Sequence, residues 1–257
     1  MDKVEVFRAL HIPGDPLVLF NIWDAGSAAA VASAGAKAIA TGSYGVARAR
    51  GSSDGENFAL GDVLANLAEI IGVTDLPVTI DMEAGYGGDA AAVGGAVAKA
   101  RALGAAGINM EDRLPGLDDL LPVAEAAARI AAAAHSGVFV NARCDVFRGK
   151  AGAQDTAPLI ADTITRAHAY AEAGAGCLFV PFLADSATIA AICAGSPLPV
   201  NILWSPPCGD RAALAALGVA RISHGHQPWA AAMAWLEAQA RAVLSGGVPP
   251  YSAGAAS

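Results

Sequence analysis

The segment VTIDMEAGYGGDAA, which begins at Val78, places two carboxylates beside a glycine-rich turn. Its first residues are typical of a buried β-strand, and Asp81 and Glu83 stand at the end of that strand. Side chains two residues apart in a strand point to the same side, so the two acids are expected to share one face. Carboxylates held this close repel one another unless protons or a cation intervene. The pair therefore indicates a cation site at the end of this strand.

Further charged residues end the next two predicted strands. Glu111 follows the strand GINM, and Arg143 and Asp145 come at the end of the strand VFVNAR. Oxygen ligands without cysteine or histidine favour a hard cation such as Mg²⁺, with Mn²⁺ as the alternative. The Arg143 guanidinium offers a fork that matches a carboxylate or an enolate oxygen. The other interpretation is structural: the acids cap helices or pair with arginines, and Arg143 forms a salt bridge to Asp145 or Glu111.

The elements that must position these residues repeat one pattern, in which an alanine-rich helix ends at a glycine and a β-branched run follows. Helices are expected over residues 60–71, 123–134 and 228–244. Eight strands are predicted, at residues 17–22, 37–41, 77–82, 107–110, 138–143, 177–181, 199–203 and 219–223. This alternation predicts a single-domain (β/α)8 TIM barrel over residues 1–245, followed by a loosely packed C-terminal tail at 246–257. A doubly wound sheet is the alternative, but no G-x-G-x-x-G follows the first strand.

In a TIM barrel the chemistry gathers at the carboxyl ends of the strands, which is where the charged residues fall. His224 and His226 follow the last strand, but a third ligand of that type is not evident, so they are left out of the metal site. The four cysteines form no C-x-x-C pair and are expected to be reduced and mostly buried.

Composition limits the choice of partners. The formal net charge of −8 argues against an extended nucleic-acid backbone as a partner. The first residues lack the apolar stretch of a signal peptide, and charge interrupts the apolar runs well before membrane-spanning length. A cytoplasmic protein with neither a nucleic-acid nor a membrane partner is expected.

Four segments in register resemble the isocitrate lyase and phosphoenolpyruvate mutase superfamily. IDMEAGYGG resembles the D-x-D-x-G-Y-G motif of that superfamily, with Glu83 in place of the second aspartate. INMEDRL resembles its strand that ends in Glu-Asp, and NARCDVF resembles its A-R-x-D segment. GSYGVARARGSSDGE resembles its second-strand loop, which leads to Asp54. Order and spacing agree from about Phe20 to His224.

The resemblance implies a Mg²⁺ site and a small carboxylate substrate. Mg²⁺ would be held by Asp81, with Glu83 and Glu111 acting mostly through bound waters. The backbone N–H groups of Ser43 and Tyr44 would receive a substrate carboxylate, and Arg143 would stabilise an enolate oxygen. Asp54 and Tyr44 join Arg143 as candidate catalytic residues, and Asn201 joins the substrate-binding set. The resemblance also implies an eighth helix exchanged between subunits of a homodimer or homotetramer.

One departure from the family pattern narrows the reaction. Superfamily lyases that cleave isocitrate or methylisocitrate carry a K-[KR]-C-G-H loop after the fourth strand, whereas this chain reads EDRLPGLDDLLPVAE. Decarboxylation of an oxaloacetate-like acid needs no cysteine acid, so a Mg²⁺-dependent carbon–carbon lyase of this kind is favoured. Cleavage of a C–P bond by a mutase or hydrolase is the second hypothesis. A protein that binds Mg²⁺ and a 2-oxo acid without turnover is the third.

Overall fold

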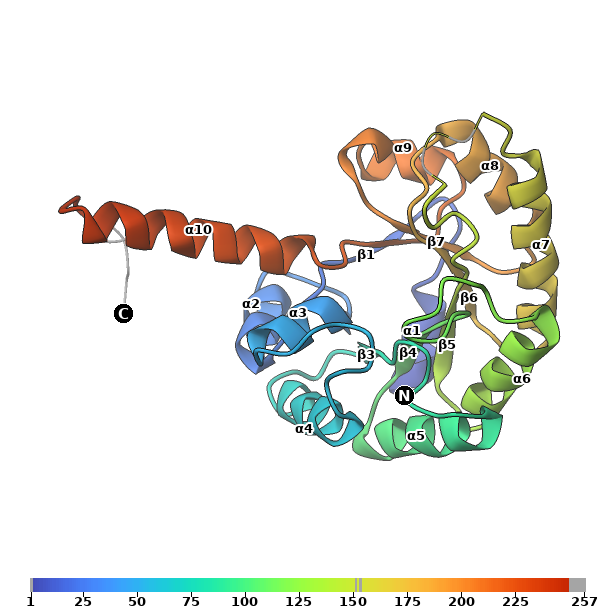
Figure 1. Cartoon of the computed structure of the whole chain (residues 1–257), viewed down its shortest axis with the longest axis horizontal. Helices are drawn as coiled ribbons and strands as arrows, with labels where there is room; N and C mark the ends of the chain where they lie inside the picture. Colours follow the sequence, from blue (N-terminus) through green and yellow to red (C-terminus); the bar gives the residue numbers. More distant parts are fainter. Residues whose placement is uncertain (1, 151, 153, 250–257) are drawn as a thin grey trace.

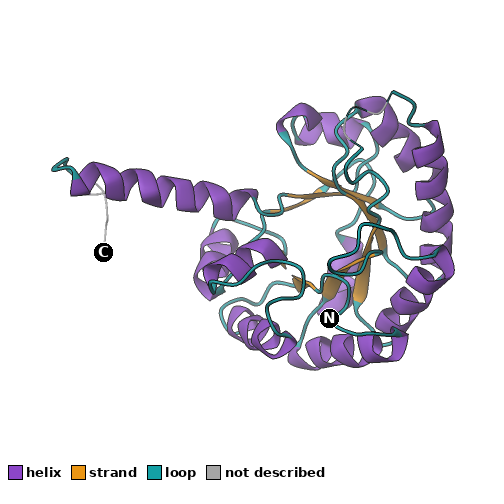
Figure 2. Cartoon of the chain, viewed as in Figure 1, coloured by secondary structure: helices purple, strands orange, loops and turns teal. Residues whose placement is uncertain are grey.

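The computed structural model describes residues 2–150, 152 and 154–249, which form a barrel of eight parallel strands surrounded by helices (Figure 2). The strands are β1 (Leu17–Leu19), β2 (Ile39–Ala40), β3 (Val78–Asp81), β4 (Gly107–Glu111), β5 (Phe139–Arg143), β6 (Cys177–Val180), β7 (Val200–Leu203) and β8 (Arg221–Ser223). Seven of the eight lie within the predicted segments, and β4 extends one residue beyond its segment, to Glu111. The predicted (β/α)8 fold is confirmed.

The sheet closes on itself between its first and second strands. Strand order is β1-β8-β7-β6-β5-β4-β3-β2, and β1 pairs with β8 in parallel. The chain just beyond β1 then reaches the chain just beyond β2 through a parallel bridge between Ile22 and Thr41. Because all strands run in the same direction, their carboxyl ends meet at one mouth.

The helices of the described chain are α1 (Lys3–Ala9), α2 (Ala25–Ser33), α3 (Ser43–Ala49), α4 (Leu60–Ile71), α5 (Ala90–Leu103), α6 (Val123–Ala134), α7 (Ala157–Glu172), α8 (Ser186–Gly195), the 3₁₀ turn η1 (Pro206–Cys208), α9 (Arg211–Ala216) and α10 (Gln227–Leu244). Helices α2 to α9 surround the barrel (Figure 1). Aspartates cap several of them. The side chains of Asp24, Asp89, Asp185 and Asp210 accept the N–H of the residue three positions on, which satisfies the first turns of α2, α5, α8 and α9.

The barrel interior is apolar at its amino end and polar toward the middle. Helix α1 closes the amino end, where Phe7 is buried against Phe139. Higher in the barrel, the Asn141 amide donates to the Asn109 carbonyl oxygen at 2.8 Å, and Arg221 donates to the same oxygen at 3.0 Å. All three strand side chains are buried. The mouth therefore lies above a packed core and not above a channel.

Helix α10 leaves the barrel and projects away from it (Figure 1). Its side chains of Trp235 and Leu236 are 55% and 53% exposed, which is unusual for large apolar residues. No helix in the described part of the chain is long and apolar enough to cross a membrane. Of the predicted tail, residues 250–257 lie outside the described residues.

Candidate active site

Asp81 is the last residue of β3 and lies at the barrel mouth. Its Oδ2 accepts the Ser43 N–H at 3.3 Å, and its Oδ1 accepts the Glu83 N–H at 3.2 Å. No described cation lies within salt-bridge distance of this carboxylate. Burial raises the pKa of Asp81 above its ordinary value; the charge of Arg143 opposes that shift and the charge of Asp54 adds to it. Asp81 thus retains oxygen lone pairs for a cation.

Glu83 does not continue the strand, contrary to the expectation that it shares a face with Asp81 by strand alternation. Strand β3 ends at Asp81, and the backbone of Glu83 is left-handed, with φ of +48°. Its Oε2 accepts the N–H groups of Gly55 and Glu56, both at 2.7 Å. The carboxylate therefore reaches the loop between α3 and α4. Burial raises the pKa of Glu83 to about 7, and the charges of Asp81 and Asp54 add to the shift.

Arg143, at the end of β5, lies between two carboxylates. Its Nε and Nη2 donate to the two oxygens of Asp145 at 2.6 Å and 2.8 Å, and its Nη1 lies 2.7 Å from Oε2 of Glu111. Both predicted salt bridges of Arg143 are present. Burial raises the pKa of Glu111 to about 7, against the opposing charge of Arg143. A guanidinium has five N–H donors, so Arg143 keeps donors for a further anion.

Asp145 is the residue through which the arginine is fixed. Its side chain has no exposed surface, and it also faces Arg113 at 3.7 Å and Arg148 at 3.5 Å. The backbone N–H of Asp145 donates to Asp112 Oδ1 at 3.0 Å, and the Tyr170 hydroxyl donates to Asp112 Oδ2 at 2.7 Å. Arg143 is thus held by a chain of buried groups that extends to α7.

The remaining predicted residues are spread around the mouth and beneath it. The Ser43 N–H is used by Asp81, and the Tyr44 ring packs against His226 at 5.4 Å and Trp229 at 5.7 Å between ring centroids. Asp54 is an exposed loop residue whose charge acts on both Asp81 and Glu83. Asn201 is fully buried inside the barrel, where its amide donates to Ser223 Oγ at 3.1 Å.

The rings of Phe20, His224 and Trp204 lie next to one another. The His224 ring is 5.4 Å from the Phe20 ring and 5.6 Å from the Trp204 ring. Phe20 is 49% exposed and lines a groove outside the barrel. The Trp204 indole N–H donates to the Gly209 carbonyl at 2.8 Å. All four cysteines are free thiols, three of them buried, as predicted.

The residues at the mouth suit Mg²⁺ bound partly through water. Within residues 2–150, 152 and 154–249, no three Asp, Glu, His or Cys side chains are grouped closely enough to hold a metal ion by themselves. Mg²⁺, however, keeps several waters and takes only one or two protein carboxylates together with substrate oxygens. Asp81 can be such a ligand, since it is acidic and unpaired with any described cation. The oxygen-only donor set therefore fits Mg²⁺.

Several residues that the structure brings to this site have no signature in the sequence. Glu56 accepts the Tyr86 N–H at 2.8 Å, and the Tyr86 hydroxyl donates to Glu83 at 3.0 Å. Phe182 follows β6 with φ of +64°, is 47% exposed, and its ring centroid lies 5.8 Å from the Arg143 guanidinium carbon. No periodicity in the sequence predicts these contacts. Only the position of Phe182, just beyond a predicted strand, indicates that it lies at the mouth.

Comparison with known proteins identifies the family. Residues 7–244 match the family model described as phosphoenolpyruvate phosphomutase. The chain belongs to the phosphoenolpyruvate phosphomutase family. The predicted membership in the isocitrate lyase and phosphoenolpyruvate mutase superfamily, and with it the prediction of an enzyme, are confirmed.

Proteins with related sequences match most of the chain. A Burkholderia cenocepacia protein, assigned provisionally as a phosphonomutase, is 48% identical with a TM-score of 0.90, over 94% of this chain and all of that one. A Mycobacterium tuberculosis protein is 38% identical over 96% of this chain and 92% of its own length. An oxaloacetate decarboxylase of Rhodopseudomonas palustris is 35% identical over 71% of this chain and 64% of that protein.

One more solved structure supports the fold. A phosphonopyruvate hydrolase in complex with oxalate and Mg²⁺ has a TM-score of 0.84 at 24% identity, over all of this chain and 92% of that one. At this identity the likeness concerns the barrel alone. The same fold thus holds Mg²⁺ and a small dicarboxylate in that protein.

Proposed function

We propose that the chain is a Mg²⁺-dependent lyase that breaks a carbon–carbon bond in a small 2-oxo or hydroxy acid through an enolate, with an oxaloacetate-like acid as the favoured substrate. One observation carries the proposal. At the mouth, Asp81 has no cation partner among the described residues, whereas Arg143 is fixed by Asp145 and Glu111 and keeps N–H donors. The unpaired carboxylate can hold the metal that chelates the substrate acid. The fixed guanidinium can stabilise the enolate oxygen as its charge develops.

Asp81 would hold the metal directly, with Glu83 and Glu111 reaching it through waters. Bound Mg²⁺ supplies positive charge that favours electron withdrawal into the oxo group. In decarboxylation of oxaloacetate the bond to the distal carboxylate breaks, carbon dioxide leaves, and the electron pair forms the enolate of pyruvate, which then takes a proton at carbon. The remaining N–H donors of Arg143 would hold the enolate oxygen. N–H groups at Ser43 and Tyr44 would receive the substrate carboxylate, with the Ser43 N–H leaving Asp81.

The sequence of the fourth-strand loop supports decarboxylation over isocitrate cleavage. This loop, residues 113–122, contains neither cysteine nor histidine. Its Asp118 is exposed and contacts Arg113, so it offers no buried acid to the mouth. The oxaloacetate decarboxylase relative adds support at the level of the family. Catalysis would then require charge stabilisation at Arg143 and little assistance from a protein acid.

The test is pyruvate formation from oxaloacetate, followed through a lactate dehydrogenase couple. Since Mg²⁺ alone decarboxylates oxaloacetate slowly, Asp81→Asn at the same Mg²⁺ concentration is the matched control. We expect the unaltered protein to exceed this variant by roughly 10³-fold, equivalent to about 4 kcal/mol. Equal rates for the two proteins would rule out the metal mechanism.

C–P bond chemistry is the second candidate, and the phosphonomutase assignment of the 48% identical structure favours it. Phosphonopyruvate should then give inorganic phosphate or phosphoenolpyruvate, while oxaloacetate gives no pyruvate. A protein without catalytic activity would instead bind oxalate with Mg²⁺ and convert neither acid. The cytoplasmic location and the absence of nucleic-acid partners stay predictions.

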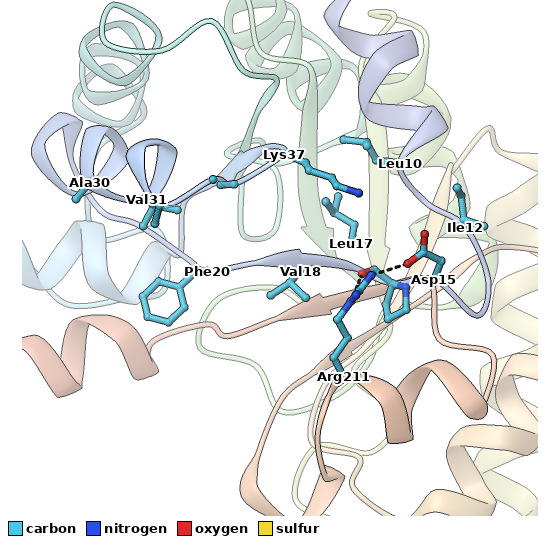
Figure 3. Close-up of a pocket in the computed structure, with 14 residues that line it drawn as sticks. Leu10, Ile12, Asp15, Leu17, Val18, Phe20, Ala30, Val31, Lys37 and Arg211 are labelled. Atoms are coloured by element: carbon cyan, nitrogen blue, oxygen red, sulfur yellow. Dashed lines mark hydrogen bonds and ion pairs between the residues drawn. The ribbon is translucent and has the colours of Figure 1, made fainter.

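We also propose that two copies associate by exchanging α10, with the projecting helix of one lying in the outer groove of the other. The groove is a concavity of about 650 Å³ between β1, α2 and α9 (Figure 3). Val18, Phe20 and Ile12 line it and are 37%, 49% and 50% exposed. Helices α2 to α9 lie around the barrel, whereas α10 projects away from it (Figure 1).

The oligomeric state in solution tests the exchange. Phe20→Lys in the groove and Trp235→Lys on α10 should each yield a monomer by light scattering, whereas the unaltered protein is a dimer or tetramer. Leu103→Lys is the control, since Leu103 is 41% exposed on the distant helix α5. A monomeric unaltered protein, or variants that keep its mass, would refute the exchange.

A further inference from the structure

We propose that Glu83 is a positioning residue that fastens the loop at residues 51–59 over the barrel mouth and so places Asp54 beside Asp81. The Glu83 Oε2 accepts two consecutive N–H groups of that loop, from Gly55 and Glu56, both at 2.7 Å. The consequence for catalysis rests on the proposed function, but the fastening itself does not.

Two further hydrogen bonds close this contact into a ring. The Oε1 of Glu56 accepts the Tyr86 N–H at 2.8 Å, and the Tyr86 hydroxyl donates to Oε1 of Glu83 at 3.0 Å. Each of the three residues therefore contacts the other two. The loop and the β3 end, about thirty residues apart in sequence, are linked in both directions.

The backbone of all three residues is left-handed. The φ angles are +58° at Glu56, +48° at Glu83 and +53° at Tyr86. Residues with side chains rarely adopt this conformation, and it persists where surrounding contacts fix it. Glycine would suit the backbone at these positions, but only residues with these side chains can form the ring. The left-handed backbone and the hydrogen bonds of the ring occur at the same three residues. This supports a role for the ring in holding the loop.

Among the described residues, the ring supplies the hydrogen bonds that join residues 53–58 to the barrel, and Phe58 faces Leu67 and Ile80 across a small cavity. In the described part of the chain, the other hydrogen bonds of residues 53–58 stay within the loop region, as between Asn57 Nδ2 and the Asp54 carbonyl at 2.9 Å. A cavity of only about 10 Å³ remains between Phe58 on the loop and Asp81, so the closed loop leaves room for one water at most. The position of Asp54 thus depends on the ring.

Hydrogen exchange in Glu56→Ala, with Glu56→Gln as the matched control, tests the fastening. Alanine removes the acceptor for Tyr86, whereas glutamine keeps a carbonyl oxygen at that place. If the ring acts as one unit, the Gly55 amide, which binds Glu83 and not Glu56, should exchange on the order of tenfold faster in the alanine variant only. Unchanged protection at Ile80 in β3 would show that the barrel remains folded. A Gly55 amide as protected as in the unaltered protein would overturn the proposal.

A double-mutant cycle tests the positioning of Asp54. Asp54→Asn should lower kcat/KM strongly in the unaltered background and much less in Glu56→Ala, where Asp54 is already displaced. Full additivity of the two effects would reject the positioning role even if the loop is loosened. If no acid is turned over at all, the proposed function fails, and Mg²⁺–oxalate affinity replaces kcat/KM in the same cycle.

Discussion

Arg143 and Asp145, two residues apart at the end of β5, form a bidentate pair whose two hydrogen bonds measure 2.6 Å and 2.8 Å. The carboxylate is wholly buried, and its backbone N–H is anchored by Asp112, which Tyr170 and Arg166 of α7 contact at 2.7 Å and 3.2 Å. The orientation of the arginine is therefore set by buried groups that extend outward to α7.

Asp145→Asn should reduce both activity and stability. Asparagine keeps the shape but leaves the buried Arg143 with one fewer charged partner, at a cost of about 3 kcal/mol by the usual penalty for breaking a buried pair. We expect kcat to fall by roughly 10²-fold while KM changes little, since Arg143 acts on charge that develops during the reaction. Thermal unfolding and steady-state kinetics measure the two effects. A lower Tm with unchanged kcat would remove Arg143 from the proposed chemistry.

The pH dependence of stability should differ with and without Mg²⁺. The pKa values of Glu83 and Glu111 are raised from 4.5 to about 7 in the folded protein, mainly by burial. A raised carboxyl pKa contributes stability that is present below pH 4.5 and is lost as the pH rises through 7. The metal-free protein should therefore lose Tm between pH 5 and pH 8.

Added Mg²⁺ should offset that loss, because it binds the deprotonated carboxylates. The Tm gain on adding Mg²⁺ should be small at pH 5 and largest at pH 8, as followed by differential scanning calorimetry. Ca²⁺ at the same ionic strength serves as a control for the size of the cation. A gain that is independent of pH would show that these carboxylates do not bind the ion.

The sequence predicts more of the barrel than of its mouth. Glycine stops and β-branched runs are local signals, so α4 and α6 begin and end at the predicted residues 60–71 and 123–134. Asp81 and Arg143 were placed correctly because they still belong to strands. Glu83 was misplaced because its backbone conformation depends on Gly55 and Glu56, which approach it only in the folded chain. The direction of α10 also depends on contacts distant in sequence, because helix periodicity does not show which surface the helix will pack against.

Asp81→Asn should raise the stability of the metal-free protein while abolishing its response to Mg²⁺. Burial and the charge of Asp54 disfavour the ionised form of Asp81, so a neutral isostere of similar shape relieves repulsion. We expect a Tm gain of a few degrees at pH 8, corresponding to about 1 kcal/mol, which should vanish at pH 4. Thermal scans at both pH values, with and without Mg²⁺, measure it. A variant that is less stable at pH 8 would mean that Asp81 already has a stabilising partner.

Phe182→Gly should separate backbone strain from the effect of the ring on catalysis. Phe182 has φ of +64° and is 47% exposed, so glycine removes the left-handed penalty and exposes little new apolar surface. A stability gain of about 1 kcal/mol is expected by thermal unfolding. The ring also lies over the Arg143 guanidinium, at 5.8 Å from its carbon, where it shields the arginine from water. Its loss should therefore lower kcat several-fold, since Arg143 acts on charge that develops during the reaction. Phe182→Ala, which keeps the strain but lacks the ring, should lower kcat equally without the gain in stability. Identical Tm values for the two variants would show that the left-handed backbone of Phe182 is not strained.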